Sequence, residues 1–527
     1  MSLKTPTCLL LDSNKDFDSF GYEAENKYAE LVMDGEQDDY FYFHRFKMSL
    51  HNNKNVKGDM VLEDITGKTV LAIDAFAHSI KALVNHLMDA LKTRGIGVKS
   101  SDIQWVLTVP AIWTDNSKQF MRKSAEKAGI HNDHLLISLE PEAASILCQY
   151  LPTETLCGVE SGFTMSKVGT KYMIVDLGGG TVDITVHEKI TGGCLKEISR
   201  ATGADCGGTS VDVEFIQLLK KIFGTPLIDS MKREQPEAFL DLIREFEVVK
   251  RTITPLKDKK INLAIPYNTL DSLCKQHLKK DLSSTLSYSP YANCITLKGD
   301  KMRIDAFLVK TLFDKTIKDI LSLIQEILTR KESESVTLLL LVGGFAACSL
   351  IQAEIREAFL TRRVIVPEES GLAVLKGAVL FGHNSKAIYS RKTRSTYGVT
   401  WSAPFNPEVH DQQHYIELND EAQCKNAFDI IIQKDTNVMQ GTTVKKNYGS
   451  TIGNNAVVFT IYASDKTTPV YTDEDGCTSV GEAIIEISEL SEKQFLEVEF
   501  MFGNTEVSLT AVEKKSGNSC QLSFDLI

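Results

Sequence analysis

Residues 175–186, V-D-L-G-G-G-T-V-D-I-T-V, carry the residue types best suited to chemistry in this chain. Three glycines (178–180) lie between two short β-branched segments, which predicts a hairpin. Glycines lack a Cβ atom, so their backbone amides can converge on an anion. Asp176 and Asp183 flank the turn and are candidate Mg²⁺ ligands, directly or through water. The combination predicts a nucleotide site, whereas the glycines alone would be equally typical of a tight turn.

The commoner phosphate motifs are absent from this stretch. Its glycines do not follow the G-x-G-x-x-G spacing, and no helical pattern comes directly after them. Residues 67–69, G-K-T, match the end of a P-loop, but Leu62 stands where the first glycine of that motif would be needed. We therefore predict an ordinary hairpin turn at residues 67–69.

Two further glycine turns lie in the same region of alternating strands and helices. One is at residues 203–212, before a helix, and the other follows an apolar strand at residues 337–342. Nucleotides bind where loops gather at the carboxyl ends of strands, so three such turns are stronger evidence than one. A predicted helix between them, residues 239–253, carries E-x-x-K-R, although this spacing alone favours a surface ion pair.

The elements that must position these turns follow from hydrophobic periodicity. Strands alternate with helices up to residue 382, which predicts helices packed on a sheet. Residues 383–396 are polar and basic and are predicted as a linker, and residues 397–527 contain short alternating segments typical of an all-β domain. Strands are predicted at 102–109 and 135–139, and helices at 73–94, 116–128, 142–150, 304–328 and 371–381.

Composition excludes several classes of protein. The 527 residues exceed what one core supports, so we expect two to four domains. A net charge of −12 without a long basic cluster argues against nucleic acid as a partner, and no apolar run approaches a membrane span. The start lacks the apolar core of a signal peptide. Eleven cysteines without C-x-x-C, and histidines without H-E-x-x-H, predict reduced thiols in the cytoplasm or nucleus and no zinc motif.

Taken together, these motifs resemble those of the seventy-kilodalton heat-shock protein family over nearly the whole chain. The hairpin resembles the family's second phosphate loop. In its detailed sequence the chain most resembles the divergent twelve-type branch of the family. Further matching segments are W-V-L-T-V-P-A-I-W-T-D (105–115), L-E-P-E-A-A (139–144), F-E-V-V-K-R-T-I-T (246–254), L-V-G-G-F (341–345), K-G-A-V (376–379) and L-E-V-E-F (496–500).

The resemblance implies a fold and a ligand. It implies an actin-like ATPase domain (ribonuclease H-like), α/β and two-lobed, at residues 1–382, then the linker and an all-β sandwich at 397–527 that contacts other proteins. The implied cofactors are ATP or ADP with Mg²⁺. Catalytic roles fall on Lys47, Glu140, Asp176 and Thr181, and the metal would be held by Asp176 and Asp183. Nucleotide contacts fall on Gly178, Gly179, Gly180, Thr181, Gly207, Gly208, Glu247, Lys250, Arg251, Gly343, Gly344 and Phe345.

The chain also departs from the family pattern. The family's first phosphate loop, D-x-G-T-T, occurs nowhere, and the chain opens on K-T-P-T-C-L-L-L-D, which matches the segment after that loop. Phe345 and Ala347 replace a hydroxyl residue and an arginine, and we expect Phe345 to stack on the base instead. The acidic, leucine-rich linker, the helical lid and the acidic tail are missing, which puts coupling of the lobes by linker insertion in question, and we do not expect tight closure over a client peptide.

Three functions remain open at this point. The first is a lidless chaperone-like protein that binds ATP and hydrolyses it slowly or not at all. The second is a nucleotide-sensing pseudo-ATPase that acts as a scaffold in stress or immune signalling. The third, a small-molecule kinase of the same fold, is disfavoured by the β domain and the missing loop.

Overall fold

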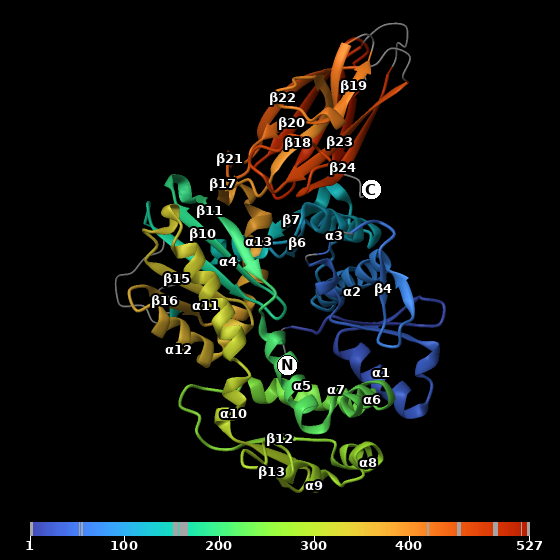
Figure 1. Ribbon diagram of the computed structural model, residues 1–527, viewed down its shortest axis with the longest axis vertical. Helices are drawn as coiled ribbons and strands as arrows, with labels where there is room; N and C mark the ends of the chain where they lie inside the picture. Colours follow the sequence, from blue (N-terminus) through green and yellow to red (C-terminus); the bar gives the residue numbers. More distant parts are fainter. Residues whose placement is uncertain are drawn as a thin grey trace.

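The computed structural model describes residues 4–51, 53, 56–150, 156–157, 167–418, 421–450, 455–487, 494–517 and 519–523. Figure 1 shows a β sandwich above a larger part built of helices and sheets, which spreads into two arms. We call residues 4–150 the first lobe, residues 167–372 the second lobe and residues 396–523 the sandwich. The predicted class, an α/β domain followed by an all-β domain, is confirmed.

The first lobe combines small sheets with covering helices. Strands β1, β2 and β3 form an antiparallel sheet in the order β2-β1-β3, while β6 and β7 pair in parallel. Phe76 of α2 packs edge-on between Phe46 and Phe120, with ring centres 5.1 and 5.4 Å apart. The predicted turn at residues 67–69 joins β4 and β5 as an ordinary hairpin. The bounds are β1 (Cys8–Leu11), β2 (Phe17–Phe20), α1 (Tyr22–Asp34), β3 (Phe41–His44), β4 (Val61–Glu63), β5 (Thr69–Leu71), α2 (Ala72–Thr93), β6 (Trp105–Val109), α3 (Asp115–Lys127), β7 (Leu135–Leu139) and α4 (Glu140–Cys148).

The second lobe is organised by an eight-stranded sheet in the order β21-β17-β11-β10-β9-β15-β16-β8. Its central strand β15 (Leu338–Val342) is buried throughout, as expected for a strand covered on both faces. The predicted glycine hairpin is present, because β9 and β10 pair in antiparallel register around residues 178–180. The other bounds are β8 (Leu156–Cys157), β9 (Lys171–Leu177), β10 (Val182–Lys189), β11 (Leu195–Ala204), α5 (Gly208–Phe223), α6 (Thr225–Glu234), α7 (Pro236–Lys250), β12 (Ile261–Ala264), α8 (Tyr267–Leu278), α9 (Leu282–Ser287), β13 (Ile295–Lys298), β14 (Lys301–Ile304), α10 (Ala306–Thr311), α11 (Asp314–Leu328), α12 (Ser349–Ala358), β16 (Arg363–Pro367) and α13 (Ala373–His383).

Two expectations about this region need correction. The helix predicted at residues 304–328 begins only at Ala306, because Ile304 belongs to β14, opposite Ile261 and Ile295, and it is interrupted between α10 and α11. The segment 383–396 contains a strand, β17 (Ile388–Lys392), which pairs in parallel with β11. The predicted linker therefore joins the second-lobe sheet: the ladder uses backbone groups, so it needs neither acidic residues nor leucines.

The sandwich consists of a five-stranded sheet and a four-stranded sheet packed face to face. Val399, Ile461, Leu496, Val498 and Leu509 are fully buried or nearly so between them. The order is β19-β20-β18-β23-β24 in one sheet and β22-β25-β26-β27 in the other. The bounds are β18 (Thr396–Pro404), β19 (Tyr415–Leu418), β20 (Glu421–Ile432), β21 (Asn437–Met439), β22 (Thr442–Gly449), β23 (Ala456–Ser464), β24 (Cys477–Glu486), β25 (Phe495–Phe502), β26 (Ser508–Glu513) and β27 (Ser519–Ser523).

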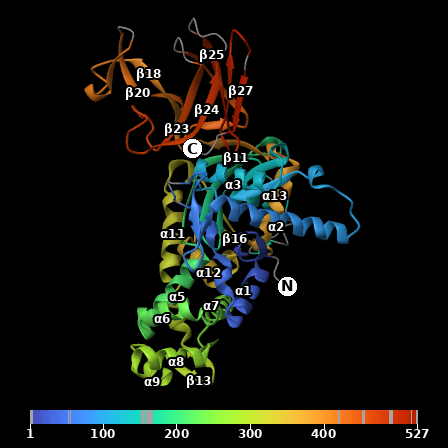
Figure 2. The same ribbon diagram turned by 90° about the vertical axis from the view of Figure 1, so that its right-hand side faces the viewer.

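The sandwich packs against the first lobe, where α3 lies directly beneath its strands in both views (Figures 1 and 2). Arg122 of α3 forms two hydrogen bonds with Glu506, and Tyr397 Oη donates to Asp115 Oδ2 at 2.6 Å. In addition, β21 pairs with β17 at the edge of the second-lobe sheet. Across the described ranges, no helix is both long and apolar enough to cross a bilayer.

Candidate nucleotide site

The glycine hairpin lies directly against the loop that begins α5. Three consecutive amides, of residues 207–209, donate to the carbonyls of residues 178–180 at 2.8–3.2 Å. A Cβ atom on Gly207 would lie 2.5 Å from the carbonyl oxygen of Gly179, so a glycine is needed for this approach. The two glycine turns predicted separately from the sequence therefore form one structure.

Three carboxyl groups converge beside the hairpin. Asp176 lies near the end of β9, Asp183 near the start of β10, and Glu140 at the start of α4. Burial, followed by the charges of Glu140 and Asp183, raises the pKa of Asp176 well above its ordinary value. Burial and Glu140 raise the pKa of Asp183 to about 6, although its Oδ1 accepts a hydrogen bond from the amide of Ile112 at 3.0 Å. Such mutual repulsion is what a bound divalent cation relieves.

Lys47 supplies a positive charge to the same cluster. Its Nζ lies 2.7 Å from Glu140 Oε1 and 5.6 Å from the centre of the Trp113 ring. Burial opposes the charge of this ammonium, but Glu140, Asp183 and Asp176 outweigh that effect and raise the pKa of Lys47. Lys47 is therefore a fixed cation beside the acids.

The residues fit Mg²⁺ and a phosphate chain. Mg²⁺ prefers oxygen ligands and keeps several waters, and the buried acids Asp176 and Asp183 offer such oxygens. Thr181 is also buried and interacts with Asp183 through its side chain. Gly343 has a φ of +89°, and a Cβ there would lie 2.3 Å from Asp176 Oδ1, so the third glycine turn also reaches this cluster.

The charged residues predicted to line the adenosine side of the site form ion pairs with one another. Lys250 Nζ lies 2.6 Å from Asp212 Oδ1 and 2.5 Å from Glu247 Oε2, and it donates to the carbonyl of Gly208 at 3.0 Å. These contacts use all three donors of the Lys250 ammonium. Arg251 is exposed and pairs with Glu247 at 3.0 Å. The ion pairs that the E-x-x-K-R spacing favoured, of Glu247 with Lys250 and Arg251, are thus present. Lys250 also pairs with Asp212.

Asp212 was missed by the sequence reasoning. Its Oδ2 lies 3.0 Å from Nη2 of Arg45, so one buried carboxylate joins Arg45 of the first lobe to Lys250 of the second. The available signals were the position of Asp212 one turn into α5, after the glycines, and the position of Arg45 two residues before Lys47. Neither residue type is diagnostic without the fold.

Phe345 lies in the core of the second lobe. Its side chain is buried, and its ring lies 6.5 Å from that of Phe313. A Cβ atom on Gly208 would be 3.3 Å from the Phe345 ring, so Phe345 packs against the start of α5. Lys4 is another residue that the sequence did not indicate. It lies beside the third glycine turn, because its Nζ would be 3.3 Å from a Cβ atom on Gly344. Its positive charge acts to lower the pKa of Asp176.

The predicted residues thus form one continuous set of contacts, from Lys47 and Glu140 through the acids and glycine turns to Gly208, Lys250 and Arg251. The family model described as "Hsp70 protein" matches residues 52–470. The chain belongs to the Hsp70 family. The two-part architecture, an α/β domain and a β sandwich, is accordingly that of an Hsp70 family member.

Relatives of the twelve-type branch match the chain over nearly its whole length. Human heat shock 70 kDa protein 12B is 31% identical over 585 residues, covering 99% of this chain and 85% of the relative. Human heat shock 70 kDa protein 12A is 31% identical over 578 residues with the same coverage. The chaperone protein DnaK of Endomicrobium trichonymphae is 26% identical over 343 residues, covering 64% of this chain and 49% of the relative. The resemblance stated from the motifs is thus confirmed at the level of the branch.

Proposed function

We propose that this Hsp70 family chain binds ATP and ADP with Mg²⁺ at the glycine hairpin, hydrolyses ATP slowly or not at all, and contacts other proteins through its β sandwich. The observation that carries the proposal is the cluster of Asp176, Asp183 and Glu140 beside Lys47 and the glycine turns. Buried acids of this kind are costly without a cation. The names of its relatives, which are heat shock and chaperone proteins, support a chaperone-like function in which the sandwich contacts other proteins.

The chemistry assigned to the site is positioning and charge compensation, which is most of what phosphoryl transfer requires. Bound Mg²⁺ would supply the charge that neutralises the phosphate oxygens. The hairpin amides bind the phosphate chain, and the Thr181 hydroxyl orients it. Lys47 holds positive charge beside the transferred group, and Glu140 keeps Lys47 in place at 2.7 Å.

The sandwich offers an apolar surface for protein contact. Val458 of β23 and Ile484 of β24 are cross-strand partners, and both side chains are about half exposed. Adjacent exposed apolar side chains of this kind are typical of protein interaction sites.

A nucleotide-sensing pseudo-ATPase is the second candidate, and the adenosine side favours it. Lys250 is already paired with Asp212 and Glu247, and Phe345 faces the core, so neither is placed to grip a base. Such a protein would bind nucleotide and signal through its partners without turnover.

Nucleotide titration separates these functions. ATP and ADP are titrated onto the purified chain with and without Mg²⁺, and phosphate release is followed. Micromolar, Mg²⁺-dependent binding with slow release supports the ATPase, and the same binding without release supports the pseudo-ATPase. Absence of binding at millimolar nucleotide refutes both.

A Gly179→Val variant tests the position of the site. A Cβ atom on Gly179 would meet nothing within 4 Å, so valine should block a ligand without disturbing the fold. Gly97→Val is the matched control, because Gly97 is equally unobstructed and lies far along the chain. Gly179→Val should reduce nucleotide affinity at least about tenfold, or about 1.4 kcal/mol. An unchanged affinity would refute the assignment to the hairpin.

A further inference from the structure

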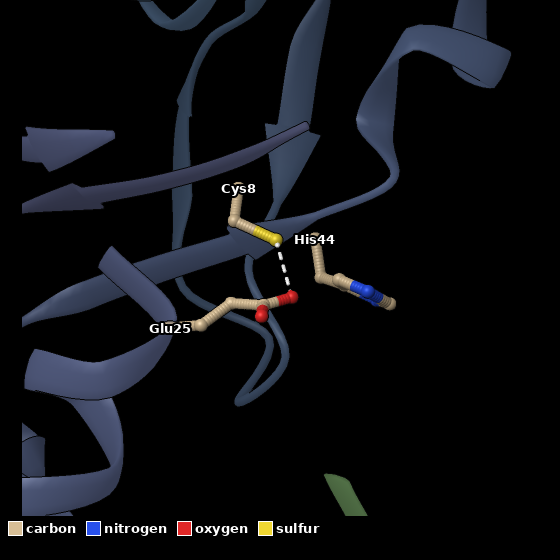
Figure 3. A group of neighbouring side chains, drawn as sticks. All are labelled: Cys8, Glu25 and His44. Atoms are coloured by element: carbon tan, nitrogen blue, oxygen red, sulfur yellow. Dashed lines mark hydrogen bonds between the residues drawn. The ribbon is translucent and has the colours of Figure 1, made fainter. Parts of the chain in front are cut away.

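Three side chains of metal-ligand type meet where β1, α1 and β3 pack together. They are Cys8, Glu25 and His44, and Figure 3 shows the Cys8 thiol facing the Glu25 carboxylate with His44 beside them. One ligand atom from each lies within 4.8 Å of the other two. Cys8 is fully buried, Glu25 nearly so, and His44 is partly exposed, which leaves a path from solvent.

The spacing of these atoms is close to that of a zinc site. Zinc bond lengths of about 2.0–2.1 Å to nitrogen or oxygen and about 2.3 Å to sulfur place tetrahedral ligands roughly 3.4–3.6 Å apart. Cys8 Sγ and Glu25 Oε1 are already 3.3 Å apart. His44 would have to approach by roughly 1 Å, a movement within reach of a side-chain rotation.

Neighbouring groups orient the ligands and leave room for one more. Arg244 of α7 binds Glu25 Oε2 at 2.9 Å, which turns Oε1 toward Cys8. The Tyr42 side chain is fully buried, and its hydroxyl lies beside the Cys8 thiol without a hydrogen bond of good geometry to any residue that the structure describes. Its ring is held by stacking on Tyr28, with ring centres 4.3 Å apart. A buried hydroxyl that has only this weak contact, beside three potential ligands, indicates room for a polar occupant.

We propose that Cys8, Glu25 and His44 bind one Zn²⁺ ion, with a water as fourth ligand that hydrogen-bonds to the Tyr42 hydroxyl. Thiolate and imidazole ligands favour Zn²⁺ over Mg²⁺ or Ca²⁺. On binding, the S–H bond of Cys8 breaks, its proton leaves to solvent, and the sulfur electron pair forms the bond to zinc.

The charges around the site are compatible with this ion. Arg45, Arg244 and Lys232 act on His44 and oppose a cation, but the Cys8 thiolate and the Glu25 carboxylate together balance the two charges of Zn²⁺. The zinc site is separate from the nucleotide cluster, and it would cross-link β1, α1 and β3 beside α7.

Metal titration of the full chain tests the proposal. The reduced, metal-free protein is given one equivalent of Zn²⁺ in competition with a chromophoric chelator. We expect one zinc per chain with a dissociation constant below about 1 μM, and a loss of at least about 100-fold in affinity for Cys8→Ala and His44→Gln. Cys148→Ala is the matched control, since Cys148 is equally buried in the first lobe and belongs to no such cluster within the described residues.

Cobalt provides an independent signature. Co²⁺ bound by the wild type should show a thiolate-to-metal charge-transfer band that Cys8→Ala lacks. His44→Gln keeps the test valid if Cys8→Ala fails to fold, because His44 lies at the edge of the core. Lack of zinc binding by the folded wild type, equal affinity in wild type and His44→Gln, equal loss in Cys148→Ala, or a cobalt complex without the band would each overturn the proposal.

Discussion

Buried carboxyl groups outside the nucleotide cluster are tolerated because backbone amides or arginine satisfy them. Glu197 of β11 is the clearest case: its Oε2 accepts from the amide of Lys392 at 2.8 Å and its Oε1 from the amide of Ala201 at 3.1 Å. Burial, followed by the charge of Glu142, raises the pKa of Glu197 to about 7. This single residue therefore senses pH at the junction of β11 with β17.

The contribution of Glu197 to stability should fall as pH rises from about 4.5 to 7. The folded state keeps the Glu197 proton up to about pH 7, whereas the unfolded state loses it near the ordinary pKa of 4.5, so folding takes up a proton in this window. The slope contributed by one group is at most about 1.4 kcal/mol per pH unit. Urea unfolding between pH 5 and 8 measures it, and Glu197→Gln should flatten the dependence. The exposed control Glu408→Gln should not; identical profiles for the two variants would contradict the assignment.

At the scale of elements, α7 is positioned by its packing on α5. The rings of Phe215 and Phe246 stack with centres 3.9 Å apart and planes 4° apart, and both are buried. The same two helices are joined at their ends by Lys250 and Asp212. Glu247 and Lys250 lie on α7, and Arg251 comes directly after it. The stacked rings therefore position the residues predicted to contact adenosine.

Phe246→Ala should destabilise the protein by about 3–5 kcal/mol, since it leaves a cavity in a packed core. Val248→Ala, on the same helix, should change the free energy of unfolding by no more than about 0.5 kcal/mol, because its side chain is 62% exposed. Denaturant unfolding of both variants gives the comparison. Similar values for the two would mean that the stacked pair does not hold α7 in place.

At the scale of the whole molecule, buried Arg391 of β17 bridges the first lobe and the sandwich. Arg391 of β17 donates to both oxygens of Glu142 in α4 at 2.8 Å and also to the carbonyl of Gly503 in the sandwich. Lys392, next to it, is bound through its amide by Glu197. The segment predicted as a linker is therefore the place where the parts are joined.

Arg391→Met should release the sandwich. It leaves the Glu142 carboxylate buried without a partner, which costs about 3–5 kcal/mol. Small-angle X-ray scattering should show a larger radius of gyration than for the wild type. Lys445→Met is the control, because it removes only the exposed Lys445–Glu497 pair within the sandwich, and exposed pairs contribute little to stability. An unchanged radius in Arg391→Met would show that other contacts suffice for docking.

Local patterns predicted the elements where they were strong and failed where tertiary contacts competed. The alternating apolar residues around the glycines and the helical spacing of residues 73–94 were sufficient for β9, β10 and α2. The 304–328 pattern was misleading, because Ile304 contributes to a strand and not to a helix. Residues 383–396 lacked a hydrophobic period, yet a strand at the edge of a sheet needs only its backbone.

The amino-acid sequence by itself determined the family, the α/β and all-β division and the set of candidate nucleotide residues, because glycine turns, acids and periodicity are local properties. Only the tertiary structure decided which partners these residues have: that Lys250 pairs with Asp212, that Phe345 faces the core, and that Cys8, Glu25 and His44 meet. No spacing rule foresees that last group, since its members lie 17 and 19 residues apart on three elements. Contacts between distant segments depend on how the elements pack, and that packing is cooperative over the whole chain.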